Sequence, residues 1–324
     1  MAGTFEELAS RVFDLYERGA YREALDLIDR EGPRFPVEAW HIAFWRLCLL
    51  ARLGDVPGAL SHLEQFLASG LWFPVSMLRN DPDLAGLQGH PAFQRAVAVC
   101  QRRHREAQDK ATSFRIFLQP ETITARDAEG PVPLLIALHG NGENARRAAE
   151  RWRFATSLGW ALLVPQSTQV MGPDAYGWDD LERGGEEVLA HCRSLQAEGA
   201  VDAGRVVVAG FSRGAALAVY LALSGRLPVC GFIAVAPHLP SWDHLKQYLS
   251  PRGAHPASKA TLGDVRGHFI AGAGDERAVR MSQDVAGWMR AAGLHARVEV
   301  LESMGHFYPP DLPDRVAPLL ADWR

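Results

Sequence analysis

A serine between two glycines is the first feature of the sequence that could do chemistry. Ser212, flanked by Gly210 and Gly214, follows an apolar run and precedes an alanine-rich run. This pattern is typical of a sharp strand-to-helix turn that exposes the serine Oγ, with glycines where side chains would collide with the neighbouring strand and helix. Three fixed residues also arise by chance, so the interpretation depends on the rest of the chain.

A serine hydroxyl becomes a nucleophile only beside a base, and the base needs an orienting carboxylate. Asp275 ends the apolar run HFIAGAGD, and His306 lies just after the last β-rich run. The order serine, aspartate, histidine along the chain is one in which such triads occur. We therefore predict Ser212, His306 and Asp275 as nucleophile, base and orienter, with Asp243 and Glu276 as alternative orienters.

A tight turn upstream could supply a second element of the same chemistry. The segment HGNG, residues 139–142, closes the apolar run PLLIAL. Its glycines allow the backbone N–H of Asn141 to stabilise a developing oxyanion together with the N–H of Arg213 at the start of the following helix. We expect His139 to stabilise this loop by hydrogen bonding rather than to transfer a proton.

The elements that must position these residues can be inferred from hydrophobic periodicity. From Phe114 onward, short β-rich runs alternate with helical segments, and several of the runs are continuously apolar, as strands buried on both faces must be. Such alternation predicts a mostly parallel sheet with helices on both faces. Ligands meet these sheets at the carboxyl ends of the strands, which is where the candidate serine, aspartate and histidine lie.

The first part of the chain has a different rhythm, with one helical segment after another. Gly19 aligns with Gly54 about 35 residues later, and Ala24 aligns with Ala59. A glycine at the inter-helix turn and a small alanine where paired helices touch resemble tetratricopeptide repeats. We therefore expect a small all-α helical-hairpin domain over residues 1–110 and a second domain over residues 111–324.

From about residue 114 to its end, the chain resembles an α/β-hydrolase of the carboxylesterase/phospholipase type, a group that includes acyl-protein thioesterases. The matching stretches are LLIALHGNGEN, ALLVPQS…YGWDD, RVVVAGFSRGAALAVYLAL, FIAGAGDERAV and LESMGHFYPP. The resemblance implies an α/β-hydrolase fold and a cofactor-independent serine hydrolase acting on esters or thioesters. It assigns Ser212 as nucleophile, His306 as base, Asp275 as orienter, and the amides of Asn141 and Arg213 to the oxyanion hole.

Departures from the family pattern leave the substrate open. Arg213 stands where such enzymes usually carry glutamine, and His238 ends an Ala-Pro-His segment where Ser-Gly is common. Tyr176 and Trp178 are expected either to pack on an acyl or alcohol group or to anchor a surface loop. His238 is a candidate substrate-binding residue or a structural hydrogen-bonder. The long connection over residues 237–268 is expected to form a lid or specificity loop rather than a disordered insert.

Composition excludes several classes of protein. The 324 residues include 34 Lys and Arg against 38 Asp and Glu, a formal net charge of −4, which favours neither nucleic acid nor an anionic membrane surface. The four cysteines lack metal-ligand spacing and no nucleotide-binding glycine loop is present, so we expect no metal and no cofactor. No signal-peptide pattern or membrane-length apolar run occurs, which indicates a cytoplasmic protein.

The sequence as a whole predicts a serine esterase that cleaves carboxylic esters, or thioesters, of small or medium acyl groups. Two alternatives stay open: a binding or scaffold protein whose helical domain engages a partner, and a serine peptidase on the same fold. The expected partners are a small-molecule ester substrate and, through the N-terminal helical domain, either another protein or a second copy of the chain.

Overall fold

The computed structural model describes residues 4–121, 130–249, 263, 265–302 and 304–323. The chain separates into two compact units. One comprises residues 1–110 together with residues 171–173, and the other comprises residues 111–170 and 174–324. Each unit has its own hydrophobic periodicity, and each is described below by itself.

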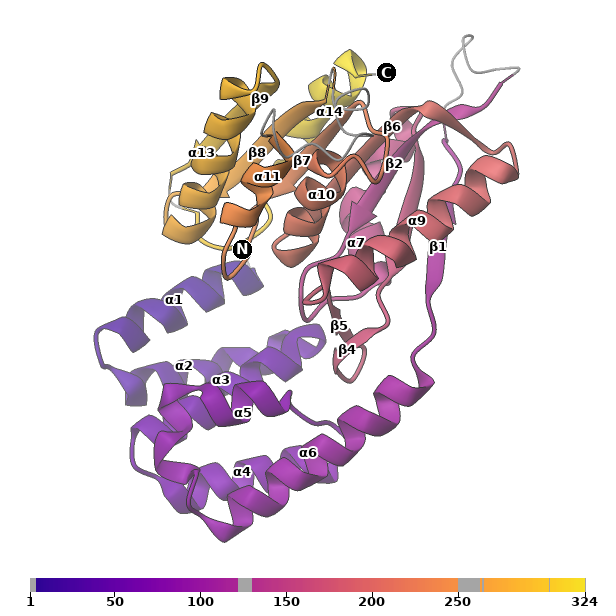
Figure 1. Cartoon of the computed structure of the whole chain (residues 1–324). Helices are drawn as coiled ribbons and strands as arrows, with labels where there is room; N and C mark the ends of the chain where they lie inside the picture. Colours follow the sequence, from indigo (N-terminus) through magenta and orange to yellow (C-terminus); the bar gives the residue numbers. More distant parts are fainter. Residues whose placement is uncertain (1–3, 122–129, 250–262, 264, 303, 324) are drawn as a thin grey trace. The chain divides into compact units, whose positions relative to one another are not determined.

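The first unit is helical (Figure 1). Its helices form two consecutive hairpins followed by a short and a long helix, with 3-10 turns at residues 32–34, 36–38 and 82–87. The hairpins are α1 (Phe5–Glu17) with α2 (Tyr21–Glu31) and α3 (Ala39–Arg52) with α4 (Val56–Ala68); α5 (Val75–Asn80) and α6 (Pro91–Lys110) follow.

The two hairpins turn in the same way. Gly19 and Gly54 both have φ of +73°, a left-handed conformation that glycine adopts without strain. The alanines predicted at the helix contacts, Ala24 and Ala59, are fully buried. The predicted alignment of two helical hairpins is therefore confirmed, while the resemblance to tetratricopeptide repeats stays a prediction.

The second unit is built on a seven-stranded sheet, in the order β1-β3-β2-β6-β7-β8-β9 across the described residues. Strand β1 runs antiparallel to β3, and the other neighbouring strands are parallel. The strands are β1 (Phe114–Leu118), β2 (Val132–Leu138), β3 (Ala161–Gln166), β6 (Val201–Phe211), β7 (Gly231–Val235), β8 (Arg266–Gly272) and β9 (His295–Leu301).

Side chains alternate along the buried strands, so that both faces of the sheet are apolar. Helices cover both of these faces. In β2, Leu134 and Ile136 pack into the core on one face, whereas Leu135 and Ala137 pack into the core on the other. The first core contains residues of α9 (Leu181–Ala197), α10 (Arg213–Leu223) and α13 (Glu276–Ala291); the second contains residues of α7 (Ala145–Trp152), α8 (Phe154–Ser157) and α14 (Leu312–Asp322). The predicted mostly parallel, doubly covered sheet is confirmed.

Two connections leave the strands of the sheet, and one of them contains residues 171–173 of the first unit. A small hairpin of β4 (Gln169–Gly172) and β5 (Ala175–Gly177) follows β3, where the sequence indicated only a loop. After β7, the chain forms a 3-10 turn (Asp243–Leu245) and α11 (Lys246–Leu249). The rest of the predicted lid, residues 250–262 and 264, lies outside the described residues.

Two further properties bear on the predicted class of protein. Within the described part of the chain, no helix combines the length and apolarity needed to cross a bilayer. The four cysteines are free of disulfides, and Cys48, Cys100 and Cys192 are buried.

Candidate active site

Ser212 occupies a strained turn between β6 and α10. Its φ of 53° and ψ of −117° lie in a region that non-glycine residues rarely adopt. A Cβ added at Gly210 would lie 2.5 Å from the carbonyl carbon of Gly214, and one added at Gly214 would lie 2.3 Å from the carbonyl oxygen of His139. Both glycines are therefore required by space, as the sequence pattern predicts.

The end of β7 holds this turn in place. The Ser212 N–H donates to the carbonyl of Val235 at 2.9 Å, and the Ser212 carbonyl accepts from the N–H of His238 at 3.1 Å. The two bonds satisfy both backbone groups of a residue in an unfavourable conformation. They also bring the segment after β7 beside the serine.

A histidine and an aspartate from two later strand ends meet at Ser212. His306, after β9, places Nε2 2.8 Å from Ser212 Oγ and Nδ1 2.5 Å from Asp275 Oδ2. Asp275 follows β8 and caps α13 through the Ala278 N–H, which donates to its Oδ1 at 3.0 Å. The Asp275 side chain is 10 % exposed and the His306 side chain 38 %, so the acid is shielded while the imidazole is open to a substrate.

The alternative orienters point elsewhere. Asp243 pairs with the Lys246 ammonium at 2.6 Å, and Glu276 is an exposed residue in the first turn of α13. Among the described carboxylates, Asp275 is the one hydrogen-bonded to His306.

The site depresses the pKa of two of its groups. Burial alone raises the pKa of Asp275, but hydrogen bonds from His306 and the Ala278 N–H outweigh burial and leave this pKa below its ordinary value. Burial and the nearby His306, Arg277 and Arg213 lower the pKa of His238. The carboxylate is therefore ionised and His238 neutral near neutral pH.

The turn after β2 is fixed by the Asn141 side chain. Its Oδ1 accepts from the Trp178 N–H at 2.9 Å, and its Nδ2 donates to Asp179 Oδ1 at 2.9 Å. These two bonds fix the orientation of the amide, and the backbone N–H of Asn141 is available to a ligand. Within the described residues, no partner bonds this N–H or that of Arg213.

Further bonds hold the same turn against the segment around β5. Gly142 donates its N–H to the carbonyl of Tyr176 at 2.9 Å, and the Tyr176 N–H donates to the carbonyl of Glu143 at 2.9 Å. The Glu143 carboxylate accepts from the Gly140 N–H at 2.8 Å. The backbone of Tyr176 therefore supports the turn, and its partly exposed side chain stays a predicted substrate contact.

His139 stabilises the loop, in line with the sequence-based expectation. The side chain is fully buried, with Nδ1 2.9 Å from the Gly140 carbonyl and Nε2 accepting from the Ser167 N–H at 3.4 Å. Burial lowers the pKa of His139 to about 4, against the hydrogen bond to Gly140, which raises it. A neutral imidazole with both nitrogens engaged is suited to support rather than to proton transfer.

Burial of Trp178 favours the second of its two predicted roles, that of an anchor for a loop. Trp178 is fully buried, its indole N–H donates to the His139 carbonyl at 2.9 Å, and its ring lies 4.7 Å from the His139 ring. Burial of a large aromatic side chain removes much apolar surface from water and so stabilises the fold. Trp178 therefore anchors the loop. His238 lies nearer the site, with its ring 5.9 Å from that of His306.

The side chain of Arg213 is held by its neighbours. Nη2 lies 3.0 Å from Asp179 Oδ1, and Nη1 donates to the carbonyl of His238 at 3.4 Å. Asp179 was not singled out from the sequence. The signal was the Asp-Asp pair directly after Trp178, of which only Asp180 is needed to cap α9.

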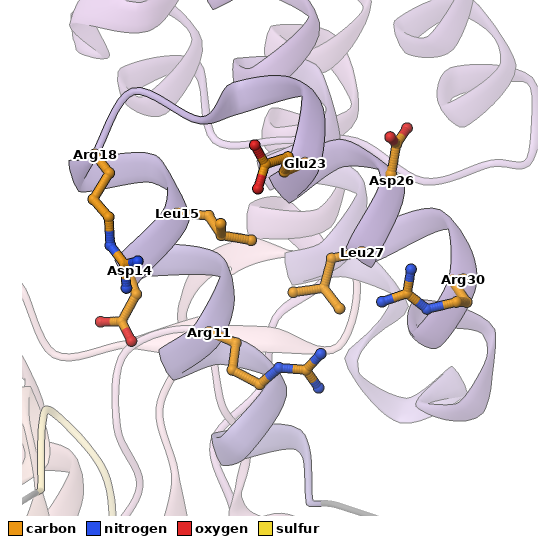
Figure 2. Close-up of a pocket in the computed structure, with 8 residues that line it drawn as sticks. All are labelled: Arg11, Asp14, Leu15, Arg18, Glu23, Asp26, Leu27 and Arg30. Carbon is orange, nitrogen blue, oxygen red and sulfur yellow. The ribbon is translucent and has the colours of Figure 1, made fainter.

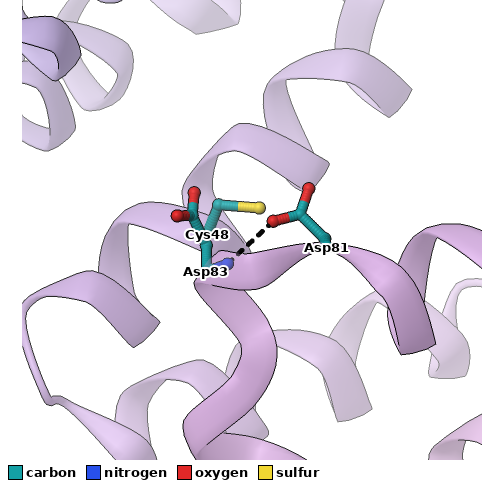
Figure 3. Close-up of side chains that lie close together, drawn as sticks. All are labelled: Cys48, Asp81 and Asp83. Atoms are coloured by element: carbon teal, nitrogen blue, oxygen red, sulfur yellow. Dashed lines mark hydrogen bonds between the residues drawn. The ribbon is translucent and has the colours of Figure 1, made fainter.

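One group of ligand-type side chains lies in the helical unit. Atoms of Cys48, Asp81 and Asp83 lie within 4.8 Å of one another among the described residues (Figure 3). Asp81 accepts from the Asp83 N–H at 3.0 Å, and Asp83 accepts from the Tyr16 hydroxyl at 2.7 Å. Burial and the two carboxylates raise the pKa of the Cys48 thiol far above its ordinary value, so the thiol is protonated in this group.

A hollow of about 450 Å³ between α1 and α2 also carries charged groups (Figure 2). Arg11 and Arg30, which line it, both pair with Glu31. The other lining residues are Asp14, Leu15, Arg18, Glu23, Asp26 and Leu27. None of these lining residues is a nucleophile beside a base, whereas Ser212 is.

Family comparisons agree with the division of the chain. Residues 4–108 match the family described as A/B hydrolase-like, N-terminal domain, and residues 180–255 match the Phospholipase/Carboxylesterase family. The second match contains Ser212 and His238. No curated protein matches the chain in sequence.

Solved structures share the fold. An uncharacterised protein from Bacillus cereus ATCC 10987 is 23 % identical, and the match covers 99 % of each chain with a TM-score of 0.53. Esterase PE8 is 19 % identical over 66 % of this chain and 100 % of its own, with a TM-score of 0.53. The Bacillus cereus carboxylesterase is 17 % identical over 68 % of this chain and 99 % of its own, with a TM-score of 0.50.

Proposed function

We propose that this chain, which joins a helical domain of the A/B hydrolase-like N-terminal type to an α/β-hydrolase domain of the phospholipase/carboxylesterase type, is a serine esterase. The observation that carries the proposal is the pair of hydrogen bonds that links Ser212 Oγ to His306 at 2.8 Å and His306 to Asp275 at 2.5 Å. A nucleophile, a base and an orienting carboxylate in hydrogen-bond contact are the requirement for acyl transfer.

In this mechanism, Ser212 Oγ attacks the carbonyl carbon of the substrate while His306 Nε2 takes the hydroxyl proton. Asp275 holds the Nδ1–H tautomer of His306 and stabilises the imidazolium that forms. The carbonyl oxygen becomes an oxyanion, which the N–H groups of Asn141 and Arg213 stabilise.

The tetrahedral adduct then collapses, and the alcohol or thiol leaves with the proton from His306. Water, deprotonated by His306, attacks the acyl-enzyme and returns Ser212 to its free form. The proposed substrates are carboxylic esters, or thioesters, of small or medium acyl groups, with Tyr176 and His238 beside the reacting carbonyl. The role of the helical domain, as a surface for a protein partner or a second copy of the chain, stays a prediction.

Hydrolysis of p-nitrophenyl esters of increasing acyl length tests this proposal. Ser212→Ala is expected to lower kcat/KM for the preferred ester by at least about 10⁴-fold, since triad members act as one unit. A fluorophosphonate is expected to label Ser212 in the wild-type protein and to leave Ser212→Ala unlabelled. Full activity of Ser212→Ala would contradict the mechanism, and a folded wild type that neither reacts nor is labelled would favour a binding protein.

A further inference from the structure

We infer that Asp179 is a positioning residue for the oxyanion hole, since it joins the two residues whose backbone amides form that hole. The inference rests on the proposed function and adds to it a carboxylate that acts through its neighbours. Asp179 follows β5 and the buried Trp178 and directly precedes the cap of α9.

One carboxylate oxygen makes both contacts. Asp179 Oδ1 lies 2.9 Å from Asn141 Nδ2 and 3.0 Å from Arg213 Nη2. Asn141 belongs to the turn after β2, whereas Arg213 is the first residue of α10. The shared oxygen therefore ties the turn that carries one oxyanion donor to the helix start that carries the other.

Each partner of Asp179 is also held at a second point. Asn141 Oδ1 accepts from the Trp178 N–H at 2.9 Å, and Arg213 Nη1 donates to the His238 carbonyl at 3.4 Å. Without Asp179, Asn141 keeps one side-chain bond and Arg213 keeps only the longer one. Loss of the carboxylate would thus weaken the restraint on the Asn141 amide and would remove the contact that links the Asn141 side chain to that of Arg213.

The exposure of Asp179 allows an effect on turnover to be distinguished from an effect on stability. Its side chain is 63 % exposed, whereas that of Arg213 is 14 % exposed. An exposed ion pair contributes little to the free energy of unfolding. The position of an oxyanion donor, in contrast, affects the rate when it changes by as little as about 1 Å. Loss of Asp179 is therefore expected to affect turnover and not stability.

Asp179→Ala tests the inference, with p-nitrophenyl acetate as the substrate. We expect kcat to fall about 10- to 100-fold, KM to change less than about twofold, and Tm to stay within about 1 °C of wild type. Asp180→Ala is the matched control, because the neighbouring carboxylate caps α9 by accepting from the Arg183 N–H at 3.0 Å. This control is expected to lower Tm and to retain kcat.

The inhibition constant of a transition-state analogue would not change if Asp179 had a structural role alone. A trifluoromethyl ketone forms a bond from its carbonyl carbon to Ser212 Oγ, the carbonyl π pair becomes the oxyanion, and the serine proton passes to His306. In Asp179→Ala, the inhibition constant of this ketone should rise by the same factor by which kcat/KM falls. Asp179→Asn, which keeps an oxygen acceptor for Asn141, should recover part of both losses.

A double variant tests whether Asp179 affects turnover through Asn141. If Asp179 acts through Asn141, the Asn141→Ala/Asp179→Ala protein should turn over little more slowly than Asn141→Ala alone. A wild type that neither hydrolyses esters nor reacts with a fluorophosphonate overturns the proposed function and the inference together. An active wild type overturns the inference alone if Asp179→Ala keeps kcat within twofold, if its loss of kcat follows a loss of Tm, or if the losses in the double variant are fully additive.

Discussion

The helical unit and the sheet-containing unit both depend on glycine, but for different physical reasons. At Gly54, φ is +73° and nothing lies within 4 Å of the position that a Cβ would occupy. At Gly214, a Cβ would lie 2.3 Å from the carbonyl oxygen of His139. The hairpin needs a backbone conformation, which another residue can adopt at modest cost. The turn at Ser212 needs empty space, for which no other residue can substitute.

Gly214→Ala is the change expected to have the largest effect on stability. The new methyl group meets backbone carbonyls of the loop after β2, which cannot move without displacing the strand. We expect the free energy of unfolding to fall by about 3 kcal/mol or more and esterase activity to be lost. Urea unfolding and the p-nitrophenyl acetate assay measure the two effects.

Two matched glycines control for this substitution. Gly54→Ala in the helical unit and Gly199→Ala in the sheet-containing unit both replace a glycine at positive φ with open space around it. Each is expected to cost about 1 kcal/mol and to leave activity unchanged. A cost at Gly214 no larger than at Gly199 would contradict the distinction between space and conformation.

A buried and a partly buried histidine extend the comparison to pH. The pKa of His139 is about 4 in the folded protein, so the unfolded chain takes up a proton below pH ~6.5 while the folded protein does not. The stabilising contribution of neutral His139 is therefore complete above pH ~6.5 and falls by about 3 kcal/mol as the pH approaches 4. Accordingly, the difference in unfolding free energy between wild type and His139→Gln should shrink over this range.

His62 is the counterpart in the helical unit. Burial lowers its pKa too, while a hydrogen bond between Nε2 and the Ala43 carbonyl at 2.8 Å opposes the shift. His62→Gln should show the same sign of pH dependence with a smaller amplitude, since His62 is only partly buried. Urea unfolding at several values between pH 4 and 7.5 measures both differences, and equal amplitudes would be inconsistent with burial as the cause.

The smallest expected effect on stability is that of Ser212→Gly. Unlike the substitutions of Gly214 and His139, it is expected to relieve strain. Its φ of 53° is strained for serine and for alanine but not for glycine. We therefore expect Ser212→Gly to be about 1 kcal/mol more stable than Ser212→Ala, with both inactive. Gly54→Ser should show the reverse and lose about 1 kcal/mol. Thermal unfolding of the four proteins measures these differences, and a Ser212→Gly protein less stable than Ser212→Ala would argue against strain.

The parts of the site that could be predicted are those encoded locally. Gly210, Ser212 and Gly214 lie within five residues and directly follow the apolar run of residues 206–209, so the pattern determines the turn. Asp275 and His306 could be placed because each follows a strand of a parallel sheet, and such strand ends share one edge. The paired hairpins were predictable for the same reason, since Gly19 and Gly54 recur at a fixed spacing.

The remaining features depend on contacts between distant segments. The sequence does not encode how deep an aromatic residue lies, so it left two roles open for Trp178, which is buried against His139. Likewise, Asp179 gains its role only when β5 brings it beside Asn141 and Arg213, which lie 38 residues before and 34 residues after it in the chain. Local pattern cannot distinguish Asp179 from its helix-capping neighbour Asp180.

The two bonds made by the Asn141 side chain have a thermodynamic consequence for turnover. The conformational entropy of this turn is lost once, when the chain folds, and not again each time a substrate reacts. The proposed oxyanion donors therefore need little reorganisation as charge develops on the substrate. Most of the entropy of activation should accordingly come from the substrate itself, which makes the length and flexibility of its acyl chain the main entropic variable of the reaction.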